Sequence, residues 1–421
     1  MRLPGKPLMF CLAAACALVA ADPRRGLAAD ADQASSETGS TDLQQLLNQL
    51  IDLRLTNGTS LGDVIVVKLV AGKSPGSVRS LTIKPSTSPR QQTLSAQMVD
   101  EIVRSGVPLD VAYNKKTREL ACSAEKRTAR IQREARIRER MQAKGAQYWQ
   151  PLPESEQQKY VAEIKAIVEQ SSQKIAVPLQ LLETRYYLFY TDMPLASVGI
   201  YIQQLDAMYT GLAKAFDFPE GKNIWRGKCP VLAFARQADY LRFEHEVMQN
   251  PAADRNLGYC HWFDNGHVVM SCFKGDSAGL FATILVHETS HGFTHRYKSN
   301  VTLPPWINEG VADWVAGTVV GKLDDQVQLR QLAAVAEIRR SGTLGADFFA
   351  DKAKLETWQY GVASSMVEIL VRIDPEKYRQ LIDGVKEGLG SEDALREAFG
   401  FGFVELTQRY GQLARVPNLQ P

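Results

Sequence analysis

The chain has 421 residues, of which 45% are hydrophobic and 23% are charged, and its formal net charge is +2. This balance describes a globular protein long enough for two domains. It argues against a protein that binds nucleic acid or another polyanion through its overall charge.

The N-terminus has the features of a secretory signal. Two basic residues precede an uncharged apolar run over residues 7–21, which is too short for a membrane-spanning helix. We therefore predict a signal peptide and pro-region over 1–29, and a mature chain that is exported to the periplasm, the cell envelope or the medium without a transmembrane segment. Cys16 follows three alanines and is a candidate lipid anchor, although the expected leucine is missing. Residues 30–41 are mostly polar and are predicted to be a linker.

Export makes the cysteines informative, because disulfides persist in oxidising compartments. Two of the six cysteines lie in the predicted signal, and the remaining four are Cys122, Cys229, Cys260 and Cys272. The last three fall in one predicted sheet region, so we expect a bridge among them, with the pairing left open. The sequence has no Cys-x-x-Cys pair, which argues against a thiolate zinc site.

Residues 42–121 are predicted to form a small β-rich module, in the manner of a partly open barrel. Residues 64–70 are rich in β-branched side chains, and residues 78–84 alternate between apolar and polar. A third strand is expected over 109–113, and short helices at the start of the module and over 98–104. The module contains no histidine, so its expected role is binding or positioning.

Residues 122–176 are predicted to be a charged helical connector. Residues 123–146 carry eight basic and three acidic side chains with only a thin apolar stripe. Such a run in an exported protein could touch an anionic surface or nucleic acid, but a solvated helix between domains is the favoured interpretation.

The catalytic region is expected over 177–421, with an α+β fold. Strands are predicted over 186–190 and 229–234, and Asp264-Asn265-Gly266 marks the turn of a hairpin between two further strands. The chain after residue 309 is predicted to be mainly helical.

An apolar segment that follows this hairpin ends in His287-Glu288-Thr289-Ser290-His291, with Asp276 and Ser277 as candidate N-caps. Residues four apart on an α-helix share a face and lie about 6 Å apart along the axis. The two imidazoles can therefore converge on one metal ion, and Glu288 can reach a water molecule beside it. The alternative is an amphipathic core helix with two incidental histidines.

A second segment supplies the carboxylates that such a site needs, because zinc requires a third protein ligand. Glu309 stands 18 positions after His291, beyond a loop broken by Pro304-Pro305. Asp313 lies one helical turn further on the same face, where it could accept the outer N–H of a ligand histidine. The alternative is a pair of ordinary acids near the positive end of a helix dipole.

The two segments, HETSH and WINEGVAD, resemble the motifs of the gluzincin zinc peptidases, and the Pro-x-Trp-x-x-Glu-Gly pattern is similar to the peptidase-MA-like branch. The resemblance covers roughly residues 180–410. It implies a gluzincin-type domain in which His287, His291 and Glu309 hold one Zn²⁺ ion. It also implies that Glu288 is the general base and that Asp313 orients a ligand histidine.

The same resemblance implies a cleft beside the zinc helix. The hairpin strand containing Gly266, Val268, Val269 and Met270 is expected to form the sheet edge that an extended substrate joins, although an ordinary edge hairpin remains possible. Tyr360 opens a later helix and is nominated to hold the developing oxyanion; the alternative is a core or rim tyrosine. The hairpin lacks the acidic residue by which gluzincin aminopeptidases recognise an amine, which favours endopeptidase action.

We therefore expect an exported zinc-dependent peptidase that acts on a peptide or protein substrate. A rival hypothesis is a secreted or envelope binding protein in which the β-rich module does the work and the peptidase fold is a scaffold. A third is zinc-dependent hydrolysis of an amide that is not a peptide bond.

Overall fold

The computed structural model describes residues 42–421, apart from 58, 106, 220 and 221. The predicted signal peptide, the linker and the candidate anchor Cys16 lie outside the described residues. The described chain is a mixed α+β protein, as predicted. It divides into two compact units, one up to Glu139 and the other from Arg140 to Pro421, and the boundary falls within helix α2 (Ala124–Ala143).

The smaller unit is built on one antiparallel sheet, as the alternating sequence predicts. Its strands follow the order β6-β5-β1-β2-β3-β8-β7, and β4 pairs with β3. Buried aliphatic side chains such as Val66, Val78 and Leu81 form its core. The elements are η1 (Leu43–Leu46), β1 (Leu50–Leu55), β2 (Ser60–Ala71), β3 (Val78–Pro85), β4 (Gln92–Ser95), η2 (Ala96–Met98), β5 (Val99–Arg104), β6 (Val107–Leu109), β7 (Val111–Asn114) and β8 (Glu119–Cys122).

The helix predicted over 98–104 is wrong, because residues 99–104 form strand β5. This strand pairs with β1 on one side and β6 on the other. Val99 and Ile102 are buried in the core. Their spacing of three is compatible with a helix, but three of the six residues are β-branched. Hydrogen bonding to β1 and β6 stabilises the strand instead.

The predicted connector is helical, but only part of it is a solvated arm. Most side chains of α2 are exposed, as expected for a charged helix. The following helix, α3 (Glu154–Lys174), buries Tyr160, Ile164 and Val168. Because Ile164 and Val168 pack against the sheet of the larger unit, α3 belongs to that unit.

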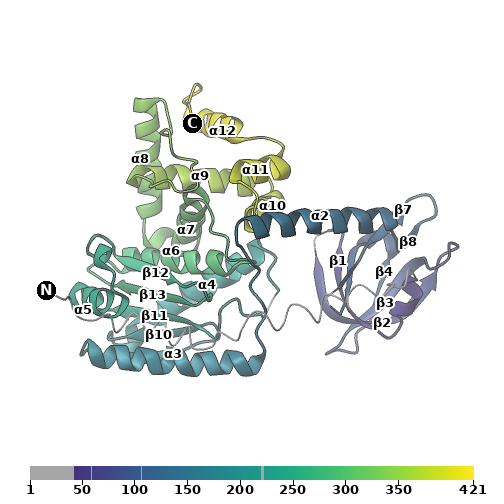
Figure 1. Ribbon diagram of the computed structural model, residues 1–421, viewed down its shortest axis with the longest axis horizontal. Helices are drawn as coiled ribbons and strands as arrows, with labels where there is room; N and C mark the ends of the chain where they lie inside the picture. The colour runs from purple at the N-terminus through teal and green to yellow at the C-terminus, as the bar shows by residue number, and fades with distance from the viewer. Residues whose placement is uncertain (1–41, 58, 106, 220–221) are drawn as a thin grey trace. The chain divides into compact units, whose positions relative to one another are not determined.

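The larger unit contains a mixed five-stranded sheet in the order β12-β13-β11-β10-β9. The inner strands β10, β11 and β13 run parallel, and the two outer strands are antiparallel to their neighbours. Helices cover both faces, with α3 and α5 on one and α4 and α6 on the other (Figure 1). The bounds are β9 (Gln180–Glu183), β10 (Tyr187–Thr191), β11 (Cys229–Phe234), β12 (Gly258–Trp262), β13 (Val268–Phe273), α4 (Gly199–Ala215), α5 (Gln237–Arg242) and α6 (Ala278–Arg296).

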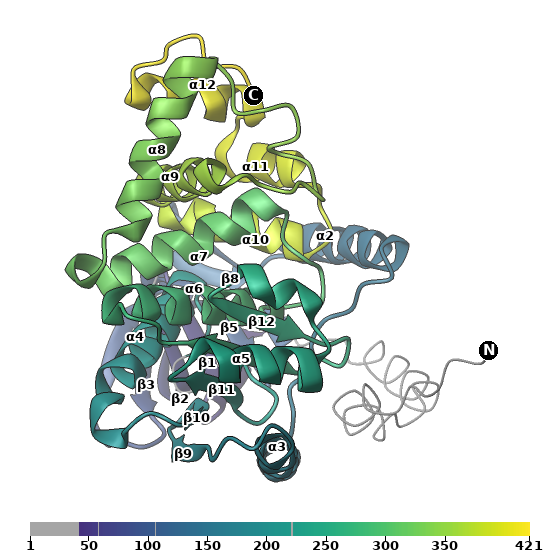
Figure 2. The same cartoon turned by 90° about the vertical axis from the view of Figure 1, so that its left-hand side faces the viewer.

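The rest of this unit is helical. Helix α7 packs against α6 and α9, and α8 packs against α9. Helices α8 and α9 therefore lie farther from the sheet than α6 and α7 do (Figure 2). Among the described residues, no helix combines the length and the apolar character needed to cross a membrane. The bounds are α7 (Pro305–Val320), α8 (Gln326–Ser341), α9 (Thr357–Ile373), α10 (Pro375–Lys386), α11 (Ser391–Phe399) and α12 (Phe403–Ala414).

The predicted disulfide is wrong, because Cys122, Cys229, Cys260 and Cys272 are all free thiols. The register of the sheet explains this. Cys260 lies opposite Met270, and Cys272 lies opposite Gly258 on one side and Ala233 on the other. No two of the three sheet cysteines are therefore direct cross-strand partners. All three are buried, and burial raises the pKa of each thiol.

Candidate metal centre

The first motif lies on the C-terminal half of α6, and the local sequence explains how the helix forms. Ser277 is the N-cap, and its hydroxyl accepts a hydrogen bond from the Leu280 N–H at 3.1 Å. The apolar run from Phe281 to Val286 is buried. This burial anchors the helix between the sheet and α7, so the histidines that follow are held in a rigid interior position.

The two histidines and the predicted third ligand come together. The Nε2 atoms of His287 and His291 are 3.1 Å apart. Oε2 of Glu309 lies 3.3 Å from each of them. Glu309 reaches this point because α7 begins at Pro305, where proline is favoured in the first helical turn. Two segments that are separate in the sequence therefore present three donor atoms to one position.

This arrangement fits a metal ion. Atoms about 2.0 Å from a central ion in a tetrahedron are about 3.3 Å apart, which matches the observed triangle. Electrostatics agrees. Burial opposes protonation of His287, but Asp313 and Glu309 outweigh it and raise the pKa of the imidazole to about 10. The carboxylates of the cluster therefore stabilise positive charge at this position, and a divalent cation would supply that charge.

Asp313 fixes the proton on one of the ligand histidines. His287 Nδ1 lies 2.8 Å from Oδ1 of Asp313, whose side chain is fully buried. Because a carboxylate only accepts hydrogen bonds, Nδ1 keeps its proton. The proton that a metal ion would replace is the one on Nε2, which faces Glu309 and His291. The sequence prediction placed Asp313 in this position. Nδ1 of His291 has no such partner among the described residues.

Glu288 differs from the other acids of the site. It follows His287 on α6 and is only half-buried. Within the described part of the chain, its carboxylate makes no hydrogen bond or ion pair, whereas Glu309 and Asp313 are both held by histidines. A carboxylate left unengaged beside a metal-binding cluster is available to exchange a proton.

Tyr360, the candidate predicted on α9, does lie near the cluster. Burial and the charge of Glu309 raise the pKa of its phenol above the ordinary value, and Asp313 and Glu288 act in the same direction. The phenol therefore stays protonated and keeps a hydrogen to donate. Arg330 of α8, which was not predicted from the sequence, lies beside both Tyr360 and Asp313. Its Nη1 donates to Oδ1 of Asp313 at 2.7 Å.

The predicted substrate strand is not at the sheet edge. Val268, Val269 and Met270 belong to β13, which pairs with β12 on one side and β11 on the other, and all three are buried. Gly266 lies in the preceding turn. The backbone of β13 therefore has no free edge that an extended peptide could join. The edge strand on this side of the sheet is β12, whose last residue, Trp262, is 45% exposed.

The other four histidines, all within the described residues, do not join the cluster. His245 pairs with Asp254 at 3.0 Å, and His261 with buried Glu244 at 3.0 Å. His267 is buried, and His295 stacks on Trp262. The hydroxyl of Tyr297, the residue after α6, is engaged elsewhere, because it lies 3.0 Å from Phe216 O and 2.8 Å from the Asp383 carboxylate.

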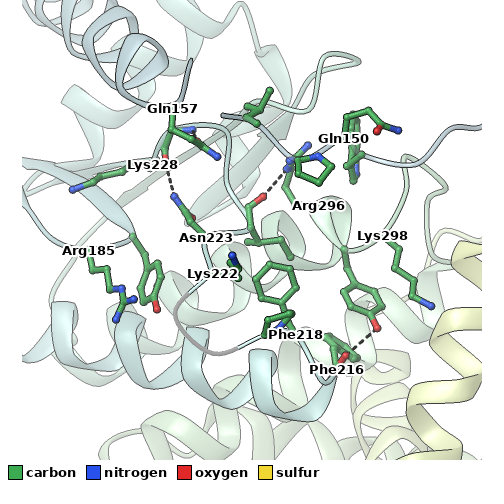
Figure 3. A pocket seen from close by; sticks show the side chains of 18 of the residues that line it. Gln150, Gln157, Arg185, Phe216, Phe218, Lys222, Asn223, Lys228, Arg296 and Lys298 are labelled. Atoms are coloured by element: carbon green, nitrogen blue, oxygen red, sulfur yellow. Dashed lines mark hydrogen bonds between the residues drawn. The ribbon is translucent and has the colours of Figure 1, made fainter. Parts of the chain in front are cut away.

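One small hollow of this unit touches the cluster, and a much larger one lies apart from it. A small recess is lined by His291 and Asn308, with Trp262 and His295 at its side. A larger cavity of about 1230 Å³ lies beside the end of α6 at Arg296 and contains none of the residues of the metal cluster. Figure 3 shows charged side chains around this second cavity, including Arg185, Lys222, Lys228, Arg296 and Lys298.

None of the known protein-family models matches this chain, and comparison with curated proteins gave no match. The chemistry that the site can perform therefore follows from its own residues. These are two imidazoles and a carboxylate around one position, a carboxylate on the outer nitrogen of one imidazole, and an unengaged carboxylate beside them.

Proposed function

We propose that the larger unit is a zinc-dependent peptidase. The observation that carries this proposal is the convergence of His287, His291 and Glu309 on one position, beside Glu288, whose carboxylate has no hydrogen bond or ion pair among the described residues. The likeness of both sequence segments to gluzincin motifs supports the same conclusion.

Zinc is the proposed ion because of the donor set. Two imidazole nitrogens and one carboxylate oxygen are a ligand set used by catalytic zinc, which keeps a fourth position open. When bound, zinc would act as a Lewis acid that polarises the scissile carbonyl and acidifies a water molecule. Asp313 would keep the Nε2 lone pair of His287 directed at the ion.

The chain's own residues account for the proton transfers. Glu288 would take a proton from the attacking water and pass it to the leaving nitrogen, which is general acid–base catalysis by one carboxylate. The Tyr360 phenol would donate a hydrogen bond to the oxyanion that develops on the carbonyl. An extended substrate would pair with the free edge of β12, with one side chain near the recess beside His291.

The test is the pair of substitutions Glu288→Gln and Glu163→Gln. Each removes one carboxylate, but Glu163 lies on α3, away from the cluster. We expect one zinc per chain by elemental analysis in the wild type and in both variants. We expect cleavage of a broad peptide library by the wild type and by Glu163→Gln, and a loss of at least about 100-fold in Glu288→Gln.

Two outcomes would contradict the proposal. Full peptidase activity in Glu288→Gln would exclude the mechanism. Zinc uptake by the wild type without cleavage of any peptide would favour a scaffold whose function is binding, which is the rival hypothesis.

A further inference from the structure

Arg330 places a positive charge between two groups of the proposed site. Its Nη1 lies 2.7 Å from Oδ1 of Asp313, and its guanidinium carbon lies 5.5 Å from the ring centroid of Tyr360. The side chain is only 19% exposed. One residue of α8 therefore contacts both the acid that holds His287 and the tyrosine proposed for the oxyanion.

These contacts are not those of an arginine that merely fastens a helix. Arg339, on the same helix, gives two N–H donors to the carbonyl of Ala414, at 3.0 and 3.2 Å. Arg330 instead directs its Nη1 donor to a buried carboxylate, and its Nε is buried without a hydrogen-bond partner among the described residues. The position of the guanidinium therefore satisfies Asp313 and Tyr360, although it leaves the Arg330 Nε donor without a partner among the described residues.

The packing of α8 on α9 explains how Arg330 reaches both groups. Gly361 follows Tyr360 directly, and a Cβ at this glycine would lie 2.1 Å from the carbonyl oxygen of Arg330. The missing side chain lets the two backbones touch at this point. The guanidinium can then lie over the Tyr360 ring and extend to Asp313 on α7.

The charges of the site agree with this placement. Three carboxylates lie around the cluster, those of Glu288, Glu309 and Asp313. A divalent cation balances two negative charges, and the guanidinium of Arg330 balances the third. A buried carboxylate that lost such a partner would carry a large desolvation penalty.

We propose that Arg330 is a positioning residue that holds Asp313 on the metal ligand His287 and holds the Tyr360 ring in place. The inference rests on the function proposed above and adds one residue to it. Among the described residues, Arg330 makes no hydrogen bond or ion pair with His287 or Glu309, so it acts through its two neighbours. Its loss should weaken metal binding through Asp313 and slow turnover through Tyr360.

Two variants separate these effects. Arg330→Met removes the charge at similar length, and Arg330→Lys keeps the charge but loses the planar group that lies over the ring. Zinc Kd is measured by competition with a chromophoric chelator, and kcat and KM are measured at saturating zinc. Arg339→Met is the matched control on the same helix.

For Arg330→Met we expect a weaker zinc Kd, by at most the about 10–100-fold that follows the loss of a group bonded directly to a ligand histidine. Arg330→Lys should recover most of the zinc affinity. Both variants should show reduced kcat with KM within about twofold of the wild type, because a hydrogen bond to the oxyanion acts in the transition state. Adding Tyr360→Phe to Arg330→Met should lower kcat by less than the product of the two single effects.

Wild-type zinc Kd and kcat in Arg330→Met would overturn the inference, as would equal losses in Arg339→Met. A wild-type chain that binds zinc but cleaves no peptide would overturn the proposed function instead. In that case the zinc affinities of Arg330→Met, Arg330→Lys and Arg339→Met still decide whether Arg330 supports Asp313.

Discussion

At the scale of single residues, the pairing of Asp313 with His287 decides how the cluster meets a cation. A neutral imidazole has one protonated nitrogen, and the acid at 2.8 Å from Nδ1 selects which one. The energetic value of that selection depends on burial. Asp313 has no exposed surface, so its hydrogen bond to His287 lies in the protein interior, where leaving the N–H without a partner is costly.

This dependence can be measured with Asp313→Asn and Asp313→Ala. Asparagine keeps an oxygen that can accept the Nδ1 hydrogen but loses the charge, whereas alanine removes both. We expect zinc Kd to weaken in the order wild type, Asn, Ala, with the alanine variant about 10–100-fold weaker. Titration against a competing chelator gives these values. Asp254→Ala, at the half-exposed pair with His245, should leave zinc Kd unchanged; equal affinities in all four proteins would rule out the role of Asp313.

At the scale of helices and strands, the sequence correctly predicted those features that depend on residues close together in the chain. The apolar run capped by Ser277 forms α6, and the turn Asp264-Asn265-Gly266 joins β12 to β13, as expected. His287, His291 and Glu309 could be predicted together because each lies in a short motif whose helical geometry is fixed. The chemistry of the site follows from these few positions.

Features that depend on packing between distant elements were not predictable. A hairpin does not reveal which of its strands lies at the sheet edge, and the parallel pairing of β13 with β11 places β12 there. Arg330 lies in a helix without a motif, and it reaches the site only because α8 touches α9 at Gly361. The one signal in the sequence was Gly361, next to Tyr360. A glycine there indicates that another segment packs closely against the helix, but it does not indicate which segment.

The contact at Gly361 leads to a prediction for stability. Gly361→Ala would place a Cβ 2.1 Å from Arg330 O, so α8 must move away from α9. We expect a loss of about 1–3 kcal/mol in the free energy of unfolding, measured by urea denaturation. Gly211→Ala on α4 is the matched control, because a Cβ there meets nothing within 4 Å. That substitution should stabilise the protein by up to about 1 kcal/mol through helix propensity. Similar effects of the two substitutions would contradict the close contact.

At the scale of the whole molecule, the larger unit buries several titratable groups outside the metal cluster, and these link its stability to pH. His267 is 7% exposed, and its ring meets the edge of Tyr160 at 5.0 Å between centroids. Burial lowers the pKa of His267 to about 4, and the charges of Arg226 and Arg296 act in the same direction. The folded protein therefore keeps this imidazole neutral at pH values where the unfolded chain would protonate it.

The sign of the effect follows from proton linkage. Below the ordinary histidine pKa of about 6.5, His267 is protonated in the unfolded chain, whereas in the folded chain it stays neutral down to about pH 4. The free energy of unfolding therefore decreases as the pH falls through this interval. The contribution of His267 between pH 7 and pH 4.5 is about 2–3 kcal/mol, on the basis of about 1.4 kcal/mol per unit.

His267→Phe tests this contribution, because it keeps an aromatic ring against Tyr160 and removes the titration. Urea denaturation at pH 7 and pH 4.5, with chelator present throughout, should show a smaller loss of stability in the variant by about 2–3 kcal/mol. The control is His245→Gln, which removes a histidine whose side chain is 42% exposed and should leave the pH dependence of the wild type intact. Equal pH dependence in wild type and His267→Phe would mean that the buried imidazole is protonated in the folded protein, with Arg226 and Arg296 unable to prevent it.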